Sequence, residues 1–250
     1  MHEIAEADKN GKKALITGST GALGSAIARR LSADGFEVWL HHRGKRDVAE
    51  SLLAEIQTIG GYGRVLQFDL TKSEELDAVL YPALSAFGPV DVLVNNAGTA
   101  SEGYMMMLPE EKWLGVMDTN LGGFFRVTRA CLKGMVQKRG GRVINISSLA
   151  GAKGTVGQVA YSASKAGIEG ATRTLAVEMA RWNILVNAVA PGPLESGMAS
   201  QDQHAKFIKE IPLGRLGRLD EVAGVVSFLA SDDATYLTGQ VIAVNGGMGM

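Results

Sequence analysis

Short apolar stretches alternate with longer amphipathic ones along most of the chain. The short stretches are too brief for helices, and several are apolar throughout, which is typical of strands covered on both faces. They cover 14–17, 37–41, 64–68, 91–95, 142–147, 184–190 and 240–245. The stretches between them are long enough for helices, and they include 22–33, 48–59, 73–87 and 222–231.

Strands that alternate with helices favour right-handed crossovers and a parallel sheet. We therefore predict an α/β fold, a single doubly wound (Rossmann) domain over residues 1–250 with about seven strands and helices on both faces. The polar residues 1–11 form an N-terminal extension in this interpretation. In such a sheet, ligands bind beyond the carboxyl ends of the strands, so the informative residues should follow each strand.

Composition narrows the class of protein. The chain has 32 glycines but only 6 prolines, a net charge of −1 and 46% hydrophobic residues, which excludes collagen and disorder. The near-zero net charge shows no basic excess of the kind that nucleic-acid-binding proteins carry. Cys131 is the only cysteine, so an internal disulfide is impossible and a reducing compartment is favoured. With no apolar stretch of ~18 residues and no apolar leader, we expect a cytoplasmic chain without a membrane partner.

A glycine-rich turn follows the first predicted strand. Residues 17–24 read Thr-Gly-Ser-Thr-Gly-Ala-Leu-Gly and lead into a predicted helix. Glycines there let the backbone turn tightly and approach a pyrophosphate, while the helix N-terminus offers free N–H groups. The alternative is an ordinary tight turn, which the strand before it and the helix after it disfavour.

The second strand ends at His41, His42 and Arg43. A free ribose 2′-hydroxyl favours Asp or Glu at this place, whereas a 2′-phosphate favours Arg, so Arg43 indicates NADP. The alternative is a solvated basic helix start. Adjacent strand residues point to opposite faces, and no carboxylate or cysteine cluster accompanies the two histidines, so we expect no metal site.

Two further strand ends carry polar or small residues. Asp69, which precedes Leu70, either accepts a hydrogen bond from an adenine amino group or caps the next helix. The thin loop after the fourth strand, Asn95-Asn96-Ala97-Gly98, lets a flat cofactor pass closely.

Tyr161 and Lys165 are four residues apart and so share one helical face. An ammonium beside a phenol lowers the tyrosine pKa, which suits proton transfer near neutral pH.

In this order the motifs resemble the short-chain dehydrogenase/reductase family over nearly the whole chain. The carrying residues are the glycine turn, 95–98, Asn120, Ser148, Tyr161 with Lys165, and Pro191-Gly192. The C-terminal half, notably 212–217, 228–232 and 244–248, is most similar to 3-oxoacyl-[acyl-carrier-protein] reductases.

The resemblance implies a role for each matching residue. Tyr161 would protonate the carbonyl oxygen as general acid, and Ser148 would polarise that carbonyl. Lys165 would hold the nicotinamide ribose and depress the Tyr161 pKa, and Asn120 would anchor a water in the proton relay. The implied cofactor contacts are Gly18, Ser19, Thr20, Gly21, Leu23, Gly24, Arg43, Asp69, Leu70, Asn96, Ala97, Gly98, Tyr161, Lys165, Pro191, Gly192, Leu194 and Ser196.

Two positions depart from the family pattern. Ala22 stands where the family usually has glycine, and Gly21 stands where many NADP-using members carry a basic residue. The arrangement resembles the extended branch with its sugar-nucleotide epimerases, but the chain is too short for that branch's added substrate domain. NADPH remains favoured over NADH through Arg43.

Other segments bear on substrate and assembly. Residues 192–210 match the family's substrate lid, with Gly197 as a hinge. Met105, Met106 and Met107 border the substrate cleft of the family, or pack beneath the loop as core. Lys138, Arg139 and Arg181 either meet an acidic carrier protein or form a solvated face. The resemblance also implies a homotetramer.

We therefore predict an NADPH-dependent oxidoreductase of fatty acid biosynthesis, a ketoreductase that converts a carrier-linked 3-oxoacyl thioester to the 3-hydroxyacyl product. The alternative enzyme is a dehydrogenase of a small alcohol, sugar or steroid with the same apparatus. A third reading is a cofactor-binding protein without catalysis, which the complete set of four catalytic residues disfavours.

Overall fold

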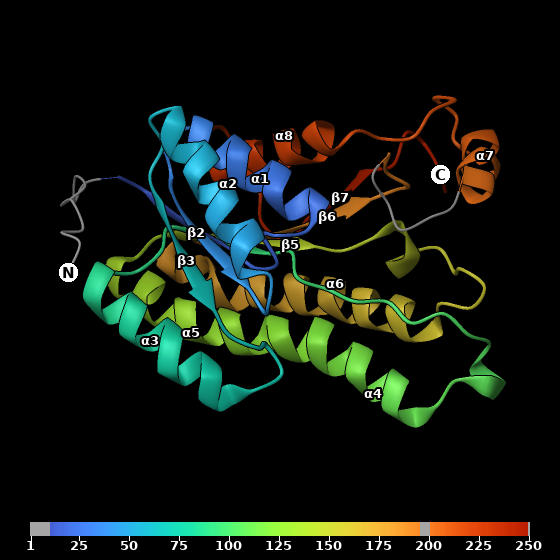
Figure 1. The fold of residues 1–250 in the computed structure, drawn as a ribbon, viewed down its shortest axis with the longest axis horizontal. Coiled ribbons are helices and arrows are strands. Elements are labelled where there is room, and N and C mark those ends of the chain that lie inside the picture. The colour runs from blue at the N-terminus through green and yellow to red at the C-terminus, as the bar shows by residue number, and fades with distance from the viewer. Residues whose placement is uncertain (1–10, 196–200, 250) are drawn as a thin grey trace.

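Seven parallel strands form one sheet in the computed structural model, which describes residues 11–195 and 201–249 (Figure 1). The strand order is β3-β2-β1-β4-β5-β6-β7. The strands are β1 (Lys13–Ile16), β2 (Glu37–His42), β3 (Gly63–Gln67), β4 (Val92–Asn95), β5 (Gly141–Ile146), β6 (Ile184–Pro191) and β7 (Val241–Val244). The predicted doubly wound sheet is confirmed, and every predicted strand end lies within one residue of the observed one.

Helices cover both faces of the sheet. Figure 1 shows α1, α2 and α8 on one face and α3, α5 and α6 on the other. The helices are α1 (Ala22–Ala33), α2 (Arg46–Thr58), α3 (Ser73–Phe87), α4 (Glu110–Met117), α5 (Gly123–Lys138), α6 (Val159–Met179), α7 (Gln201–Glu210) and α8 (Leu219–Ala230). The helix predicted from residue 48 begins at Arg46 instead, because its first turn is polar and pairs Arg46 with Glu50.

Two hydrophobic clusters, one on each face of the sheet, form most of the core. Val38 and Leu40 of β2 lie in the cluster with α1 and α8, whereas Trp39 lies in the cluster with α3 and α5. All three side chains are fully buried. Because successive strand residues point to opposite faces, a strand covered on both sides is apolar at consecutive positions, as β2 is from Val38 to Leu40.

The strand order reverses at β1, which pairs with β2 on one side and β4 on the other. Crossovers to opposite faces leave a crevice at such a switch point, outside the carboxyl ends of the strands. The glycine turn after β1 and the 95–98 loop after β4 both lie at this crevice. The fold therefore brings the sequence-predicted segments to one edge. In the described part of the chain, none of the helices is long and apolar enough to cross a membrane.

Candidate active site

The glycine turn is held tightly against the 95–98 loop. Gly18 has a φ of +64°, and a Cβ on it would lie 2.9 Å from the Cα of Ala97. The Asn96 side chain donates to the carbonyls of Thr17 and Gly18, at 2.9 and 3.1 Å. The Thr17 hydroxyl accepts hydrogen bonds from the main-chain N–H groups of Asn96 and Ala97. These contacts fix the two segments as one surface.

Gly24 is required for the close approach of α1 to this surface. A Cβ at Gly24 would lie 2.3 Å from the Gly18 carbonyl oxygen, so no other residue fits there. Gly21 is different, because its φ of −80° suits any residue and a Cβ would meet only one atom, at 3.5 Å. Gly21 is the N-cap of α1 and has no side chain to occupy the N–H groups of the first turn. Those N–H groups suit a phosphate.

The end of β2 supplies the positively charged side chain of Arg43 and the buried imidazole of His42. Arg43 is exposed, and its main-chain carbonyl accepts a hydrogen bond from the Gln67 side chain at 3.4 Å. His42 is 1% exposed, and within the described residues neither of its ring nitrogens has a hydrogen-bond partner. Buried polar atoms of this kind normally have partners, so the region fits a polar ligand. Burial lowers the pKa of His42, and Arg46 acts in the same direction.

Asp69 closes a turn before α3. Its Oδ1 atom accepts hydrogen bonds from the Thr71 N–H and hydroxyl, at 2.9 and 2.8 Å. Burial opposes the charge of Asp69, but the bonds from Thr71 hold its pKa below the ordinary range. The N-cap of α3 is Lys72, so the expectation that Asp69 caps that helix is wrong. The Thr71 contacts leave Oδ2 for another donor, as the adenine interpretation requires. The neighbouring Leu70 is buried against Gly123.

Asn120 lies in a π-helical turn, η2 (Asp118–Gly122), between α4 and α5. Such turns are rare and occur frequently at functional sites. The Asn120 amide donates to the Thr99 carbonyl and to the Ser164 hydroxyl, both at 2.9 Å, and its oxygen accepts from the Thr99 N–H at 2.8 Å. Both amide hydrogens are therefore occupied by protein. Asn120 ties the loop after β4 to α6.

Ser148 and Tyr161 come together as the sequence predicts. Ser148 is the N-cap of the 3-10 helix η3 (Leu149–Gly151), where its hydroxyl accepts from the Ala150 N–H at 3.2 Å. The Ser148 side chain also lies close enough to the Tyr161 phenol to lower its pKa. A carbonyl oxygen placed between the two hydroxyls would meet both, which is the arrangement that carbonyl reduction by a general acid needs.

The sign of the Tyr161 pKa shift corrects the sequence-based expectation. Burial raises the pKa of Tyr161, and the neighbouring Ser148 side chain offsets this only in part. The Nζ atom of Lys165 lies 5.6 Å from the centre of the Tyr161 ring and donates instead to the Ile146 carbonyl, at 2.7 Å. Lys165 is 3% exposed, and burial lowers its pKa to about 8. Tyr161 is thus a protonated phenol at neutral pH, which is the form a general acid requires.

The 95–98 loop reaches these groups as well. A Cβ at Gly98 would lie 3.3 Å from the Asn120 side-chain oxygen and 3.5 Å from Lys165 Nζ. A side chain at residue 98 would therefore crowd both groups. The loop that passes the glycine turn at Ala97 therefore runs close to two of the four predicted catalytic residues at Gly98.

The segment after β6 forms the other wall. Gly192 donates its N–H to the Val244 carbonyl at 3.0 Å, and a Cβ there would collide with Asn245. Leu194 bridges to Gly217. Pro191, the last residue of β6, is buried. Ser196 and the proposed hinge Gly197 lie outside the described residues, whereas the predicted lid contains α7.

Three methionines are exposed on the 99–109 loop. Met105, Met106 and Met107 have exposed fractions of 66%, 92% and 76%, so the reading that they pack as core is wrong. The loop is joined to the segment after η3 by a hydrogen bond from the Gly103 N–H to the Gly157 carbonyl, at 2.9 Å. In Figure 1 this loop and α7 extend beyond the same end of the sheet.

The basic residues considered for a carrier protein lie at the opposite edge. Lys138 pairs with Asp91, which immediately precedes β4, and donates to the Val90 carbonyl. Arg139 donates to the Arg181 carbonyl, just before β6 begins. The structure therefore does not bring these residues to the catalytic groups of the same chain. In the described ranges, no three His, Cys, Asp or Glu side chains gather as a possible metal site.

Sequence reasoning missed two groups that organise the site. The His41 ring contacts Gly18 and Phe68, and the Thr17 hydroxyl orders the 95–98 loop. Both are buried polar residues, His41 near the end of β2 and Thr17 directly after β1, where the strand covering would favour apolar side chains. That mismatch was visible in the sequence.

Comparison with known proteins agrees with this geometry. Residues 18–249 match a family model described as Enoyl-(Acyl carrier protein) reductase. The chain is 42% identical over 242 residues to the 3-oxoacyl-[acyl-carrier-protein] reductase FabG of Staphylococcus epidermidis, covering 96% of this chain and 99% of that protein. It is 41% identical over 243 residues to FabG of Escherichia coli and 40% identical over 242 residues to FabG of Staphylococcus aureus, covering 96% of this chain and 98% of each relative.

Proposed function

Because the chain belongs to the short-chain dehydrogenase/reductase family, we propose that it reduces the 3-oxo group of an acyl-carrier-protein-linked thioester to a 3-hydroxyl with NADPH. The single observation that carries this proposal is the meeting of Ser148 with Tyr161, close enough for Ser148 to lower the Tyr161 pKa, with Lys165 one helical turn further along α6. Full-length similarity to 3-oxoacyl reductases favours this substrate class over other carbonyls.

The proton step follows from the states of these groups. Tyr161 keeps its proton at neutral pH because burial raises its pKa, and it donates that proton to the carbonyl oxygen as negative charge develops there. Ser148 orients the same oxygen by its hydroxyl. Lys165 carries its positive charge at neutral pH, since its pKa is about 8, and so stabilises the phenolate that Tyr161 becomes.

The glycine turn, Asp69 and the 95–98 loop would hold the dinucleotide, which supplies a hydride to the carbonyl carbon when bound. The fit is supported by the uncapped start of α1 and by the thin loop at Ala97 and Gly98. Arg43 and the orphaned His42 at the end of β2 support a 2′-phosphate, and hence NADPH rather than NADH.

The substrate enters beside α7 in this proposal. Residues 192–210 act as a lid on a single domain, and the exposed methionines of the 99–109 loop face the acyl chain. Methionine suits such a ligand because its flexible thioether adapts to apolar chains of different shape. A cytoplasmic location is proposed from the same family membership.

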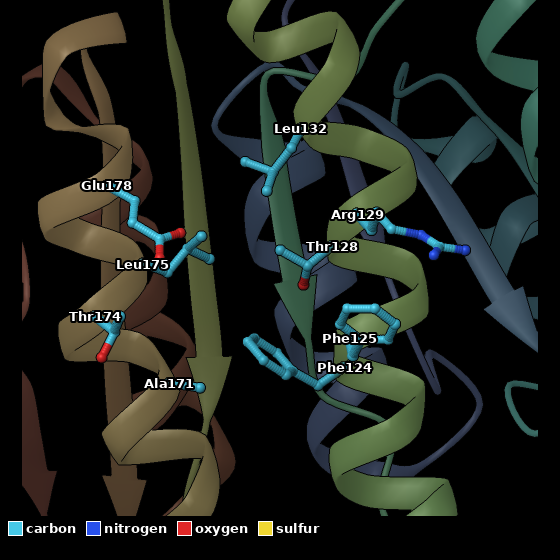
Figure 2. A pocket seen from close by; sticks show the side chains of 9 residues that line it. All are labelled: Phe124, Phe125, Thr128, Arg129, Leu132, Ala171, Thr174, Leu175 and Glu178. Atoms are coloured by element: carbon cyan, nitrogen blue, oxygen red, sulfur yellow. The ribbon is translucent and has the colours of Figure 1, made fainter.

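A tetramer is proposed for the assembly. An apolar groove of about 390 Å³ lies between α5 and α6, and Figure 2 shows Phe124, Leu132 and Leu175 directed into it. Phe125, in the same groove wall, is 56% exposed. An exposed phenylalanine on α5 beside an apolar groove shared with α6 suits the same face of a second copy around a two-fold axis.

The test measures kcat/KM for acetoacetyl and crotonyl thioesters with NADPH, and for small free alcohols with NADP⁺. The proposal expects acetoacetyl-carrier protein to be used at least ~100-fold better than the others, a difference of about 3 kcal/mol in transition-state binding. Preferred reduction of the crotonyl double bond would overturn it in favour of an enoyl reductase. Preferred oxidation of an alcohol would do so in favour of a dehydrogenase.

A further inference from the structure

The imidazole of His41 connects the two segments that flank the end of β2. Its Nδ1 atom accepts a hydrogen bond from the Gly18 N–H at 3.1 Å, and its Nε2 atom lies 2.9 Å from the Phe68 carbonyl oxygen. Gly18 belongs to the turn after β1, and Phe68 follows β3. Since β2 lies between β1 and β3 in the sheet, the His41 side chain connects the segments that follow its two neighbouring strands.

These partners define the state of the ring. Nδ1 must be unprotonated to accept from Gly18, so Nε2 carries the hydrogen that is donated to Phe68. The ring is 2% exposed, and burial lowers its pKa to about 4. It also packs on the Phe68 ring, with centres 4.2 Å apart. His41 is therefore a neutral imidazole in one fixed tautomer at neutral pH, and with both nitrogens engaged it cannot bind a metal.

The main chain of His41 adds to this connection. Its carbonyl oxygen accepts from both the N–H and the hydroxyl of Ser19, at 2.9 and 3.1 Å. The regular ladder between β1 and β2 ends at Ile16 and Leu40. Beyond that point His41, rather than regular pairing with β2, holds the first part of the glycine turn on the β2 side, while Asn96 holds it on the β4 side.

The two segments joined by His41 are those proposed for the adenosine half of the cofactor. The turn would receive the pyrophosphate, and Asp69, which directly follows Phe68, would receive the adenine. We propose that His41 is a positioning residue that sets the separation of these two subsites and so determines affinity for the adenosine half of the dinucleotide. This inference rests on the proposed cofactor binding, and it does not depend on which carbonyl is reduced.

Three substitutions separate the two contacts. In His41→Asn the amide oxygen replaces Nδ1 and keeps an acceptor for Gly18, while the donor to Phe68 is lost. In His41→Gln the longer side chain reaches the Nε2 position and keeps the donor, while the acceptor for Gly18 is lost. His41→Leu removes both contacts and retains an apolar side chain of moderate size.

Asn187→Leu is the matched control. Asn187 is a buried strand residue that also makes two main-chain contacts, to the Leu237 carbonyl at 2.8 Å and from the Gln240 N–H at 3.0 Å. These contacts lie far along the sheet, between β6 and the approach to β7. The control therefore reports what the loss of two buried hydrogen bonds does to stability alone.

The experiment measures Kd for NADPH, 2′,5′-ADP and reduced nicotinamide mononucleotide by fluorescence titration or calorimetry, together with Tm and kcat at saturating NADPH. His41→Leu is expected to raise the Kd for NADPH and the Kd for 2′,5′-ADP in parallel, each by at least ~10-fold. The kcat at saturating NADPH should stay within ~2-fold of wild type. The Asn and Gln variants should fall between. Binding of the nicotinamide half should be unchanged, and Asn187→Leu should lower Tm without changing any Kd.

A wild-type Kd for 2′,5′-ADP in all three His41 variants overturns the inference. So does a weakening no larger than that of Asn187→Leu. Failure of the proposed function looks different, since wild-type protein would then bind NADPH and show the His41 effect without reducing acetoacetyl thioester.

Discussion

The Lys165 ammonium donates a 2.7 Å hydrogen bond to the main-chain carbonyl of Ile146, the last residue of β5. Ile146 precedes Ser147 and Ser148, so this bond ties the helix that carries Tyr161 to the strand end that carries Ser148. A second link joins the same two elements, from the Ser147 hydroxyl to the buried Glu169 carboxylate at 2.8 Å. The separation of Ser148 and Tyr161 is thus set by contacts outside the pair itself.

Lys165 has a stability signature that depends on pH. Its folded pKa of about 8 lies below its ordinary value, so the unfolded chain binds the additional proton between about pH 8 and 10.5. Burial of the ammonium therefore destabilises the fold fully below pH 8, and this penalty fades as pH rises. Between pH 7.5 and 9.5, wild type should gain about 2 kcal/mol relative to Lys165→Met, as measured by urea unfolding. An equal stability difference at both pH values would contradict the assignment.

Tyr161→Phe should remove the proton donor without disturbing the fold. We expect kcat to fall by about 10²–10⁴-fold, while Kd for NADPH stays within ~2-fold, because the ring remains and only the hydroxyl is lost. Stopped-flow turnover and fluorescence titration measure the two quantities. Ser162→Ala, on the adjacent residue, is the control and should retain wild-type turnover. Substantial activity in Tyr161→Phe would exclude Tyr161 as the general acid.

Two helical glycines should respond oppositely to alanine. A Cβ at Gly24 would lie 2.3 Å from the Gly18 carbonyl oxygen, so Gly24→Ala should lower the free energy of unfolding by about 1–3 kcal/mol. Gly170 in α6 has open space around it, so Gly170→Ala should raise that free energy by up to about 1 kcal/mol through helix propensity. Chemical denaturation measures both, and a neutral Gly24→Ala would refute the close packing.

Arg43 should determine preference between the two nicotinamide cofactors. Loss of the charge in Arg43→Ala should raise the Kd for NADPH by about 10-fold or more. The Kd for NADH should stay within ~2-fold of wild type, because only NADPH carries the 2′-phosphate. Arg29→Gln is the control, since Arg29 is a surface arginine already paired with Glu55 at 2.6 Å. Equal weakening of both cofactors would place Arg43 outside the 2′-phosphate site.

Phe125 provides a test of the assembly. Phe125→Glu puts a charge into the apolar groove between α5 and α6, and should shift sedimentation at micromolar concentration from the proposed tetramer to a dimer or monomer. The matched control is Ile59→Glu, at an exposed apolar residue just after α2 with an exposed fraction of 68%. A Phe125→Glu protein that sediments like wild type would remove this groove from the interface.

The strands and the turns after them could be predicted from the sequence because both depend on local pattern. Apolar stretches bounded by glycine and polar residues mark where β1 and β4 end, and with them the glycine turn and the 95–98 loop. The direction of the Tyr161 pKa shift could not be predicted in this way. The spacing of Tyr161 and Lys165 fixes a shared helix face, but the destination of the Lys165 ammonium depends on β5, which lies on another element.

The hydrogen bonds of the His41 ring could not be predicted from the sequence either, because its partners follow the two strands that flank β2. The exposure of Met106 depends on what packs over the 99–109 loop, which composition does not encode. In each case the missing information is a contact between residues distant in sequence.

The π-helical turn at Asp118–Gly122 has a consequence for insertions and deletions. Each helical residue advances by about 100°, so the wider turn sets the rotational phase of α5 relative to α4. With this phase, Asn120 faces Ser164 while Phe125 faces outward on the next turns. Deleting one residue from the turn would restore an ordinary α-helix and would rotate α5 about its axis relative to α4. The alignment of the proposed catalytic residues and the direction of the proposed oligomer face therefore depend on the same turn of the backbone.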